Sequence, residues 1–404
     1  MSDLDFNKTT SEHMHLKSII RSIFSTSIMA ILLSACATEV EPTGTVSHPT
    51  VQTMPGSSAS TSTTQPLTVQ QAQNMLPAPP VSCVRDVYFP NFPQQYQRQL
   101  QEIACHLQIN DGLPAHYVIS ALQNARFNAR AVTLMTPPPP SQQPSAPYPW
   151  WRYRDRFLHP DRINRGLQFW NAHSALLEQV SQKYGVPGSI LMGILNIETG
   201  FGSFMGNFSV LNSNLSLSLA LPGRRRFFLH ETAETLKLAQ KLGVSPATLM
   251  GSEAGAMGMS QFLASSYLRY GIVWNDPPGG PLPNLWQSTA DVLASTANFF
   301  LGHGWQPGQP VMARVTGSGG VDATAFLHGK HPLGQLLAAG IQPEEPASLP
   351  ADTPVGLLRL QTAEGPTLFI AYPNFYAIMG YNPSVYYSAT VWAYSRAIQR
   401  ALNG

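Results

Sequence analysis

The segment at residues 185–202, GVPGSILMGILNIETGFG, limits the fold of this chain more than any other part of the sequence. Pro187 is compatible with the first turn of a helix, where its missing N–H is not needed. Ile190, Ile194 and Glu198 are spaced four residues apart and therefore lie on one face of that helix. The segment thus predicts a helix that must bury its apolar face, and Glu198 lies on that face.

Two interpretations of Glu198 follow from this placement. It is either a structural buried carboxylate satisfied by a backbone amide or an arginine, or a general acid. In the second case desolvation raises its pKa toward about 6, so that the group stays protonated long enough to donate a proton. Gly200 and Gly202 follow directly, and glycines there end the helix and let a backbone or a ligand approach closely.

The composition excludes some classes of partner. The chain has 404 residues, enough for one large domain or two. Charged residues make up 11% and the net charge is +2, whereas a nucleic-acid-binding protein shows a concentrated basic patch. We therefore predict no nucleic-acid partner. The 35 prolines are partly clustered, which indicates linkers.

The N-terminal region reads as a targeting segment. Lys17 and Arg21 form a basic region before the short apolar stretch at 28–33, which is too short to span a membrane and is typical of a secretory signal. We predict a signal peptide over residues 1–35, and Met14 is an alternative start. The sequence LSAC that ends at Cys36 resembles the lipobox of bacterial lipoproteins, in which this cysteine becomes the lipidated N-terminus. The alternative is an ordinary signal peptide with an incidental cysteine.

The two remaining cysteines, Cys83 and Cys105, fall in the exported part of the chain. In an oxidising compartment they are expected to form a disulfide, closing a loop of about 22 residues. Such a bridge contributes roughly 3 kcal/mol by the loop-entropy model. The alternative is two unpaired thiols in a helical segment.

The rest of the chain predicts a mainly α protein of the α+β class. A Ser-, Thr- and Pro-rich stretch cannot bury enough apolar surface to fold alone, a run of prolines forms a stiff spacer, and short β-like runs interrupt the helical pattern late in the chain. The predicted divisions after the signal peptide are a flexible tether at 36–80, an N-terminal helical subdomain at 81–135, a Pro-rich spacer at 136–149, a helical catalytic domain at 150–303, a small β-containing subdomain at 304–375 and a C-terminal helix at 376–404.

Four segments together resemble one family: those at 185–206, 251–271, 297–305 and 374–398. In this order and spacing they are similar to the B-type membrane-bound lytic murein transglycosylases, glycoside hydrolase family 103. The resemblance implies a lysozyme-like helical lobe with the catalytic glutamate at the end of a buried helix. It also implies a periplasmic enzyme, anchored by lipid to the outer membrane, that acts on peptidoglycan glycan strands.

The resemblance also implies roles for individual residues. Glu198 matches the family's catalytic acid/base, and the remaining matches are to groups that line the sugar cleft. Arg224 lies in an Arg-rich loop that meets the glycan or its peptide, with Arg225 as an alternative register. The cleft residues implied in this way are Tyr153, Arg224, Ser252, Gln261, Tyr381, Asn382 and Tyr387.

The chain departs from the family pattern at several positions. Phe299 stands where relatives commonly have Tyr, Met259 replaces an aromatic residue, and Asn212 stands where they commonly have Asp. Some relatives bind calcium in a loop that corresponds to WNDPPGGPLPNLW. Here Asp276 could be a first ligand, but the next ligand positions carry no side-chain oxygens. We predict no metal site and no cofactor.

The expected chemistry needs one carboxylate. Ordinary glycosidases use two, but no second one occurs in a motif position, and Glu253 is the closest in sequence. In the family scheme Glu198 protonates the bridging oxygen between N-acetylmuramic acid and N-acetylglucosamine. It then takes a proton from the muramyl C6 hydroxyl, which closes onto C1 to form a 1,6-anhydro sugar.

Two alternatives remain open at this stage. One is a hydrolytic muramidase that uses water, which would require a second carboxylate across the cleft. The other is a catalytically silent peptidoglycan-binding lipoprotein, which the departures at Phe299 and Asn212 allow. We expect a monomer, which cell-wall complexes could recruit.

Overall fold

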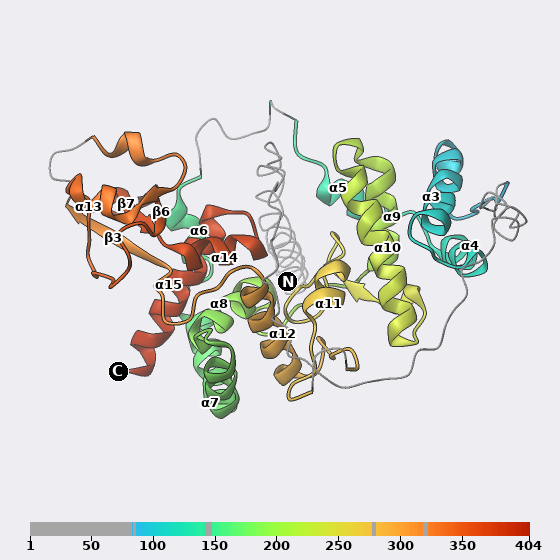
Figure 1. Ribbon diagram of the computed structural model, residues 1–404. Helices are drawn as coiled ribbons and strands as arrows, with labels where there is room; N and C mark the ends of the chain where they lie inside the picture. Colours follow the sequence, from blue (N-terminus) through green and yellow to red (C-terminus); the bar gives the residue numbers. More distant parts are fainter. Residues whose placement is uncertain (1–82, 84–85, 140, 142–147, 277–279, 318–321) are drawn as a thin grey trace, which may run out of the picture.

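The computed structural model describes residues 83, 86–139, 141, 148–276, 280–317 and 322–404. The predicted signal peptide, Cys36 and the tether lie outside the described residues, as does half of the Pro-rich spacer. Figure 1 shows a helical body between a small sheet at one end and two N-terminal helices at the other. Within the described part of the chain, no helix is both long enough and apolar enough to cross a bilayer.

Helices form most of the described chain, which confirms the predicted fold class (Figure 1). The α-helices are α3 (Gln97–Ile109), α4 (Ala115–Asn124), α5 (Ala129–Met135), α6 (Trp150–Asp155), α7 (Pro160–Tyr184), α8 (Gly188–Thr199), α9 (Val210–Ala220), α10 (Arg225–Leu242), α11 (Ala264–Tyr270), α12 (Thr289–Gly302), α13 (Leu333–Ala338), α14 (Pro373–Tyr381) and α15 (Val385–Leu402). Short 3-10 turns are η1 (Gln94–Tyr96), η3 (Pro222–Arg224), η4 (Pro246–Thr248) and η5 (Ala323–Phe326).

The largest hydrophobic core surrounds α8, and α7, α12, α14 and α15 contribute to it. Every residue of α8 is buried except Glu198, which is partly exposed. The close contact of α15 with α8 depends on Gly193, because a Cβ there would lie 3.0 Å from the Val391 carbonyl oxygen. The predicted apolar helix is therefore the centre of the helical body.

Helix α7 differs in one respect from the single long helix that its pattern predicts. His173 has non-helical backbone angles, with φ −132° and ψ 16°, so the helix bends there. Only the half after the bend buries its apolar residues fully, at Leu177 and Val180, whereas Leu167 and Trp170 before it are half-buried. The bend lets the two halves of α7 pack against different neighbours.

The N-terminal helices do not have a core of their own. Residues of α3 and α4 pack in one cluster with residues of α9 and α10, among them Leu211, Leu215 and Leu236. A further small cluster joins Met135 of α5 to Leu217 and Phe228. The segment predicted as a separate helical subdomain therefore completes the lobe of α9 and α10, because helices this short must bury their apolar faces against other elements.

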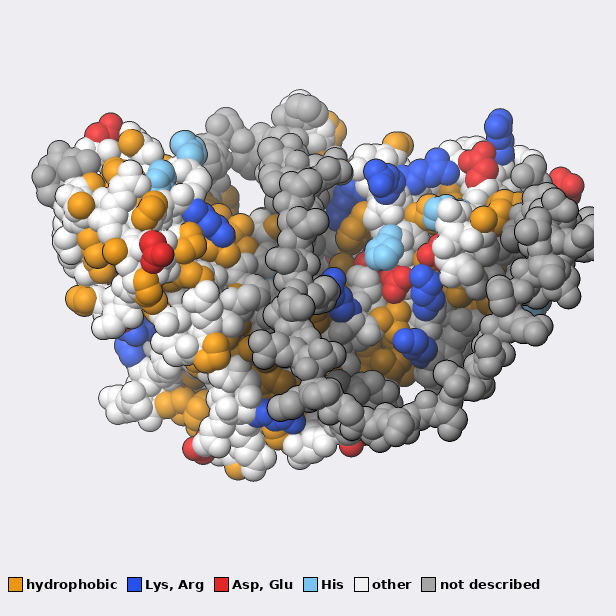
Figure 2. All heavy atoms as spheres, viewed as in Figure 1, with side chains coloured by type: hydrophobic (Ala, Val, Ile, Leu, Met, Phe, Trp, Pro, Cys, Tyr) orange, Lys and Arg blue, Asp and Glu red, His pale blue; other side chains and the backbone are white. Residues whose placement is uncertain are grey.

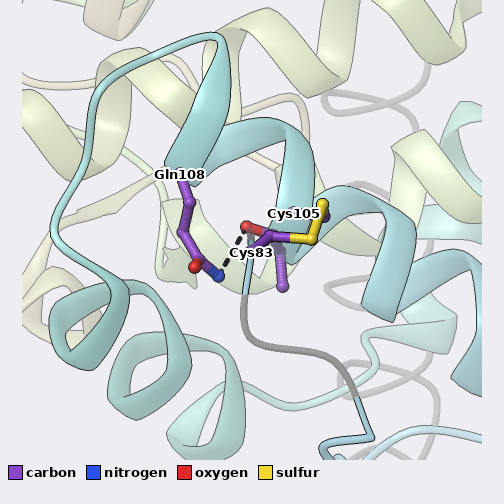
Figure 3. The surroundings of a disulfide bond; sticks show 4 residues. Cys83, Cys105 and Gln108 are labelled. Carbon is purple, nitrogen blue, oxygen red and sulfur yellow. Dashed lines mark hydrogen bonds between the residues drawn. A yellow bond between two sulfur atoms is a disulfide. The ribbon is translucent and has the colours of Figure 1, made fainter. Parts of the chain in front are cut away.

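Cys83 and Cys105 are joined by a disulfide, with their Cα atoms 5.0 Å apart (Figure 3). Cys105 lies on α3, whereas Cys83 precedes the helices. On the same helix Gln108 Nε2 donates to the Ala104 carbonyl at 3.0 Å. The bridge attaches the start of the described chain to α3.

The small sheet has five antiparallel strands in the order β4-β6-β7-β3-β5. One face packs with α13, and the other packs on the helical body, where the ring of Phe369 lies 5.9 Å from Trp150 and 6.1 Å from Trp392. A separate two-stranded pair, β1 with β2, lies in the helical body. The strands are β1 (Phe208–Ser209), β2 (Met250–Gly251), β3 (Met312–Gly317), β4 (His331–Pro332), β5 (Gln342–Pro343), β6 (Pro354–Thr362) and β7 (Gly365–Ala371).

Candidate active site

Glu198 lies in the last turn of α8, at the point where the apolar helix meets the surface. Gly200 ends the helix in the left-handed conformation, with φ +57°. Its N–H bonds the Asn196 carbonyl, and the N–H of Phe201 bonds the Leu195 carbonyl at 3.0 Å. These bonds satisfy the end of the helix and hold Glu198 in a fixed position.

The Glu198 carboxyl has one hydrogen-bond donor from far along the chain. The hydroxyl of Tyr387, on α15, donates to Glu198 Oε1 at 2.5 Å. Burial raises the pKa of Glu198 to about 7, and the Tyr387 hydrogen bond opposes that rise. A glutamate with this pKa exchanges a proton readily near neutral pH, which is the property required of a group that acts as acid and then as base.

Three predicted cleft tyrosines surround Glu198. Tyr381 stacks parallel to Tyr387, with ring centroids 6.5 Å apart, and its hydroxyl donates to the Ser260 carbonyl. Burial and the charge of Glu198 raise the pKa of Tyr153, Tyr381 and Tyr387. All three stay protonated at neutral pH, so each can donate a hydrogen bond but cannot act as a base.

The loop between β2 and α11 covers the end of α8. Thr199 Oγ1 donates to the Met259 carbonyl at 2.8 Å, which attaches the loop to the residue next to Glu198. Ser252 Oγ accepts the N–H of Ala256 at 3.1 Å. Gln261 has φ +52°, and its Nε2 donates to the carbonyls of Met205 and Gly258 at 3.2 and 2.9 Å. Both predicted loop residues thus hold the loop in shape.

The two remaining predicted cleft residues differ in their surroundings. Asn382 follows α14, and its buried Oδ1 has no hydrogen-bond partner among the described residues. The Arg224 guanidinium lies over the rings of Phe227 and Phe228, at 4.9 and 5.0 Å, in the lobe of α9 and α10. Its neighbour Arg225 faces Glu102 of α3, at 3.9 Å. Figure 2 shows Lys and Arg side chains gathered over this lobe.

Comparison with known proteins decides the family. The model of the transglycosylase SLT domain family matches residues 95–396, which is most of the chain. The chain belongs to this family. It is a lytic transglycosylase, as the four motifs predicted.

Several relatives resemble this transglycosylase over most of its length. Membrane-bound lytic murein transglycosylase B of Escherichia coli is 37% identical over 252 residues, which are 62% of this chain and 68% of that protein. The E. coli lytic transglycosylase Slt35, solved with bulgecin A, has a TM-score of 0.67 at 31% identity and covers 78% of this chain and 97% of its own. SltB3 of Pseudomonas aeruginosa, solved with NAG-anhNAM-pentapeptide, has a TM-score of 0.64 at 28% identity and covers 76% of this chain and 80% of its own.

The loop between α11 and α12, in which Asp276 is the only candidate metal ligand considered from the sequence, is held by protein groups. Asp291 accepts the backbone N–H groups of Trp274 and Asn284, each at 2.9 Å, and so joins the two ends of the loop. Residues 277–279 of the loop are outside the described range. No group of three or more metal-ligating side chains occurs in the ranges that the structure describes.

The side chains at the positions that depart from the family pattern each contact neighbouring residues in this transglycosylase. The ring of Phe299 stacks on His303 at 3.9 Å and meets Tyr381 edge-on at 4.8 Å. An aromatic ring therefore lies beside Tyr381 at this position, but it carries no hydroxyl. Asn212 Oδ1 accepts the N–H of Arg126 at 2.9 Å. Met259 packs against Gly202, where a Cβ would lie 3.1 Å from its methyl group.

Sequence reasoning did not identify three residues that support the site. Asn196 is fully buried in α8, donates to the Phe157 carbonyl at 3.1 Å and accepts from Arg162. Arg162 donates to the Asn196 carbonyl at 2.8 Å, and Thr199 holds the overlying loop. A signal did exist for Asn196, because an amide among aliphatic residues two positions before Glu198 has to find buried partners.

Proposed function

We propose that this transglycosylase cleaves the β-1,4 bond between N-acetylmuramic acid and N-acetylglucosamine in peptidoglycan and forms a 1,6-anhydromuramic end, with Glu198 as the single acid/base. The observation that carries the proposal is the Glu198 carboxyl, which burial brings to a pKa of about 7 at the end of α8. The names of the relatives support murein as the substrate, and the anhydro sugar bound to SltB3 supports the product.

The hydrogen bond from Tyr387 assigns different tasks to the two oxygens of Glu198. Oε1 accepts from the Tyr387 hydroxyl, so the transferable proton belongs on Oε2. Oε2 donates this proton to the glycosidic oxygen as the bond to the muramyl C1 breaks, and the 2-acetamido oxygen of the same sugar stabilises the positive charge. The Glu198 carboxylate then accepts the proton of the muramyl C6 hydroxyl while the oxygen of that hydroxyl forms a bond to C1. The enzyme thereby returns to its starting protonation state.

The causes of the Glu198 pKa shift support a one-carboxylate scheme. A retaining glycosidase places its two carboxyl groups about 5 Å apart, and the charge of one then raises the pKa of the other. Among the described residues, the causes that shift the pKa of Glu198 are burial and the Tyr387 hydrogen bond, and no carboxylate is one of them. This supports an internal nucleophile, the muramyl C6 hydroxyl, over a second carboxylate that acts as nucleophile close to Glu198.

The substrate contacts are also part of the proposal. Tyr381 is half-buried and would supply aromatic surface for a sugar ring close to Glu198, whereas Tyr153 and Tyr387 are buried and would act on the substrate through the surroundings of Glu198. The buried Oδ1 of Asn382, which has no hydrogen-bond partner within the described residues, would accept from a sugar N–H or hydroxyl. Ser252 and Gln261 would contact the acetamido side of the substrate from their loop, and Arg224 would contact a more distant part of the glycan or its peptide.

The location of the enzyme is likewise proposed. We assign it to the periplasm as a monomeric lipoprotein of the outer membrane, attached through Cys36. The membrane-bound relative from E. coli and the lipobox-like sequence before Cys36 support this assignment. The disulfide between Cys83 and Cys105 is consistent with an oxidising compartment.

Product analysis tests the reaction directly. Peptidoglycan sacculi are incubated with the purified Cys36→Ala protein, with or without Glu198→Gln, and the soluble muropeptides are weighed by mass spectrometry. We expect 1,6-anhydromuramic ends that disappear with Glu198→Gln. Reducing ends in their place would identify a hydrolytic muramidase, and a folded protein that binds sacculi without releasing products would identify a silent binding protein.

A further inference from the structure

Helices α7 and α15 pack closely at one point and then diverge. Gly166 of α7 allows the close contact, because a Cβ there would lie 2.7 Å from Ile398 Cδ1 of α15. One turn later along α7, Trp170 is half-buried, and the non-helical backbone at His173 bends the helix just beyond it. The bend therefore separates α7 from the last turn of α15 and leaves space between the two helices.

This space is a cavity of about 550 Å³, which we call the α7–α15 cavity. Its volume falls within the range of roughly 300–1,000 Å³ that is typical of ligand sites in proteins. It lies at the C-terminal end of α15, on the opposite side of the helical body from α9 and α10 (Figure 1). The residues that line it are Trp170, Arg396, Gln399, Arg400, Leu402 and Asn403.

The α7–α15 cavity is separate from the proposed catalytic site. Tyr387, which contacts Glu198, lies in the first turn of α15, whereas Arg400 lies in the last turn. At the rise of an α-helix these two residues are about 20 Å apart along the helix axis. A ligand in the cavity is therefore out of reach of the Glu198 carboxyl.

The cavity combines a flat aromatic ring with two side-chain amides. Trp170 packs against the core of the helical body, which holds its ring in place. Gln399 and Asn403 are exposed, and among the described residues neither amide group makes a hydrogen bond. Aromatic rings present large flat surfaces with one apolar face, and amides both donate to and accept from hydroxyl and acetamido groups. This combination suits a sugar ring.

The cavity also carries one uncompensated positive charge. Arg396 is paired with Glu345, and its Nη1 lies 3.2 Å from Glu345 Oε2. Arg400 is exposed and has no ion-pair partner within the described ranges, and the end of α15 favours its positive charge. Its guanidinium is therefore available to bind a carboxylate through two parallel hydrogen bonds.

We infer that the α7–α15 cavity is an accessory site that binds a peptidoglycan glycan strand away from the catalytic cleft. Such a strand has the three features that the cavity fits: flat sugar rings, acetamido groups and the carboxylates of its peptide stems. Because the substrate is a polymer, a second contact with the same sacculus raises the effective concentration of strands at the cleft. The inference goes beyond the proposed reaction and does not depend on the role of Glu198.

Two independent variants test the cavity. Trp170→Leu removes the flat ring and keeps an apolar side chain against the core. Arg400→Gln with Asn403→Ala removes the cation and one amide at exposed positions, where the fold is not at risk. The matched control is Arg98→Gln with Asn124→Ala, which makes the same changes at exposed positions on α3 and α4.

Binding is measured by co-sedimentation with purified sacculi, with Glu198→Gln present in every protein so that the sacculi are not digested. We expect the half-saturating concentration of sacculi to rise about tenfold for both cavity variants, because one of two linked contacts is lost. The control should bind like the parent. In proteins that retain Glu198, KM and kcat on a soluble tetrasaccharide should be unchanged, because this substrate is too short to occupy the cleft and the cavity together.

Unchanged co-sedimentation of both cavity variants would overturn the inference, and so would an equal loss on sacculi and on the tetrasaccharide. A melting temperature shows whether a loss in Trp170→Leu reflects altered packing, in which case Arg400→Gln with Asn403→Ala decides. Reduced binding to vesicles of anionic lipid, with sacculus binding unchanged, would assign the cavity to a membrane instead. Failure of the proposed function has a different signature, since Glu198→Gln proteins would then digest the sacculi.

Discussion

Glu198 and Glu231 occupy similar positions in two different regions of the molecule. Each lies on a helix with a buried apolar face, and burial raises the pKa of each. Both oxygens of Glu231 are occupied, because Ser265 donates its N–H to Oε2 at 3.2 Å and its hydroxyl to Oε1 at 2.5 Å. Within the part of the chain that the structure describes, Glu198 has one donor, the Tyr387 hydroxyl; it is partly exposed, whereas Glu231 is 2% exposed.

The comparison shows how the carboxyl that we propose to be catalytic differs from a structural one in this protein. Desolvation acts on both groups, so a raised pKa does not distinguish them. Glu231 has no free oxygen and no access for a substrate, and it joins α10 to α11. Glu198 keeps one oxygen available at the surface, next to aromatic side chains. Solvent access and an oxygen that accepts no hydrogen bond within the described residues therefore distinguish the proposed catalytic carboxyl of Glu198 from Glu231.

Replacing Glu198 is expected to have the largest effect of the substitutions that test this comparison, and the effect is on the rate of the reaction. Glu198→Gln removes the transferable proton and the base while keeping an oxygen that accepts from Tyr387. We expect the rate of anhydromuropeptide release to fall about 10³-fold or more, since general acid and general base catalysis are both lost. The measurement is the initial rate on sacculi, followed by chromatography. A fall of less than tenfold would mean that another group protonates the leaving oxygen.

Replacing Glu231 should affect stability more than chemistry. In Glu231→Gln the amide NH₂ faces a donor of Ser265, which leaves buried polar groups unsatisfied and costs about 2–3 kcal/mol of unfolding free energy. Denaturant unfolding measures this loss, and the activity of the folded fraction should stay within a factor of a few. Glu234→Gln is the matched control on the same helix, because Glu234 pairs with Lys237 in a partly buried network in which Lys237 keeps Asp111 as a second partner, so its loss should cost less than that of Glu231. Loss of activity without loss of stability in Glu231→Gln would contradict the structural role.

The pH dependence of stability measures the desolvation of the Glu198 carboxyl. The pKa of Glu198 is raised from its ordinary 4.5 to about 7, so the folded state holds this proton more tightly than the unfolded state. Stability is therefore lost as pH rises from about 4.5 to about 7. The shift corresponds to at most about 3 kcal/mol, and partial exposure reduces this to about 2 kcal/mol.

Glu198→Gln should therefore be more stable than the parent by about 2 kcal/mol at pH 8 and equally stable at pH 4. Thermal unfolding of the two proteins at both pH values measures this difference. Because Glu231 is present in both, its own contribution cancels. Equal stability at pH 8 would show that the Glu198 carboxyl is not desolvated.

The smallest expected effect concerns the donor to Glu198. Tyr387→Phe removes a hydrogen bond that lowers the pKa of Glu198, so that pKa rises. The alkaline limb of the pH profile of kcat/KM should move up by about one pH unit, and activity at neutral pH should fall about tenfold because Oε1 loses its fixed donor. Tyr386→Phe, at the neighbouring position on α15, is the control. A movement of the limb to lower pH would reverse the assigned role of Tyr387.

The helix that carries Glu198 could be predicted from short stretches of sequence. The aliphatic spacing before Glu198 and the glycine after Thr199 specify a buried helix and its end, because periodicity and left-handed backbone angles are local properties. The four motifs in order also identified the family, which the matched domain confirms. The kink at His173 and the packing of α3 and α4 on α9 and α10 were not predictable in this way, since each depends on neighbours distant in sequence.

The sequence by itself determined that a carboxyl ends an apolar helix in a lytic transglycosylase. Only the tertiary structure decided which groups meet that carboxyl and how. Tyr387 lies 189 residues from Glu198, and Ser265 lies 34 residues from Glu231. In the same way, Arg162 and Arg165 reach Gly200 only because α7 packs along α8. The physical reason is that local patterns set the conformation of each element, whereas burial, hydrogen-bond partners and hence proton affinity arise from how the elements pack together.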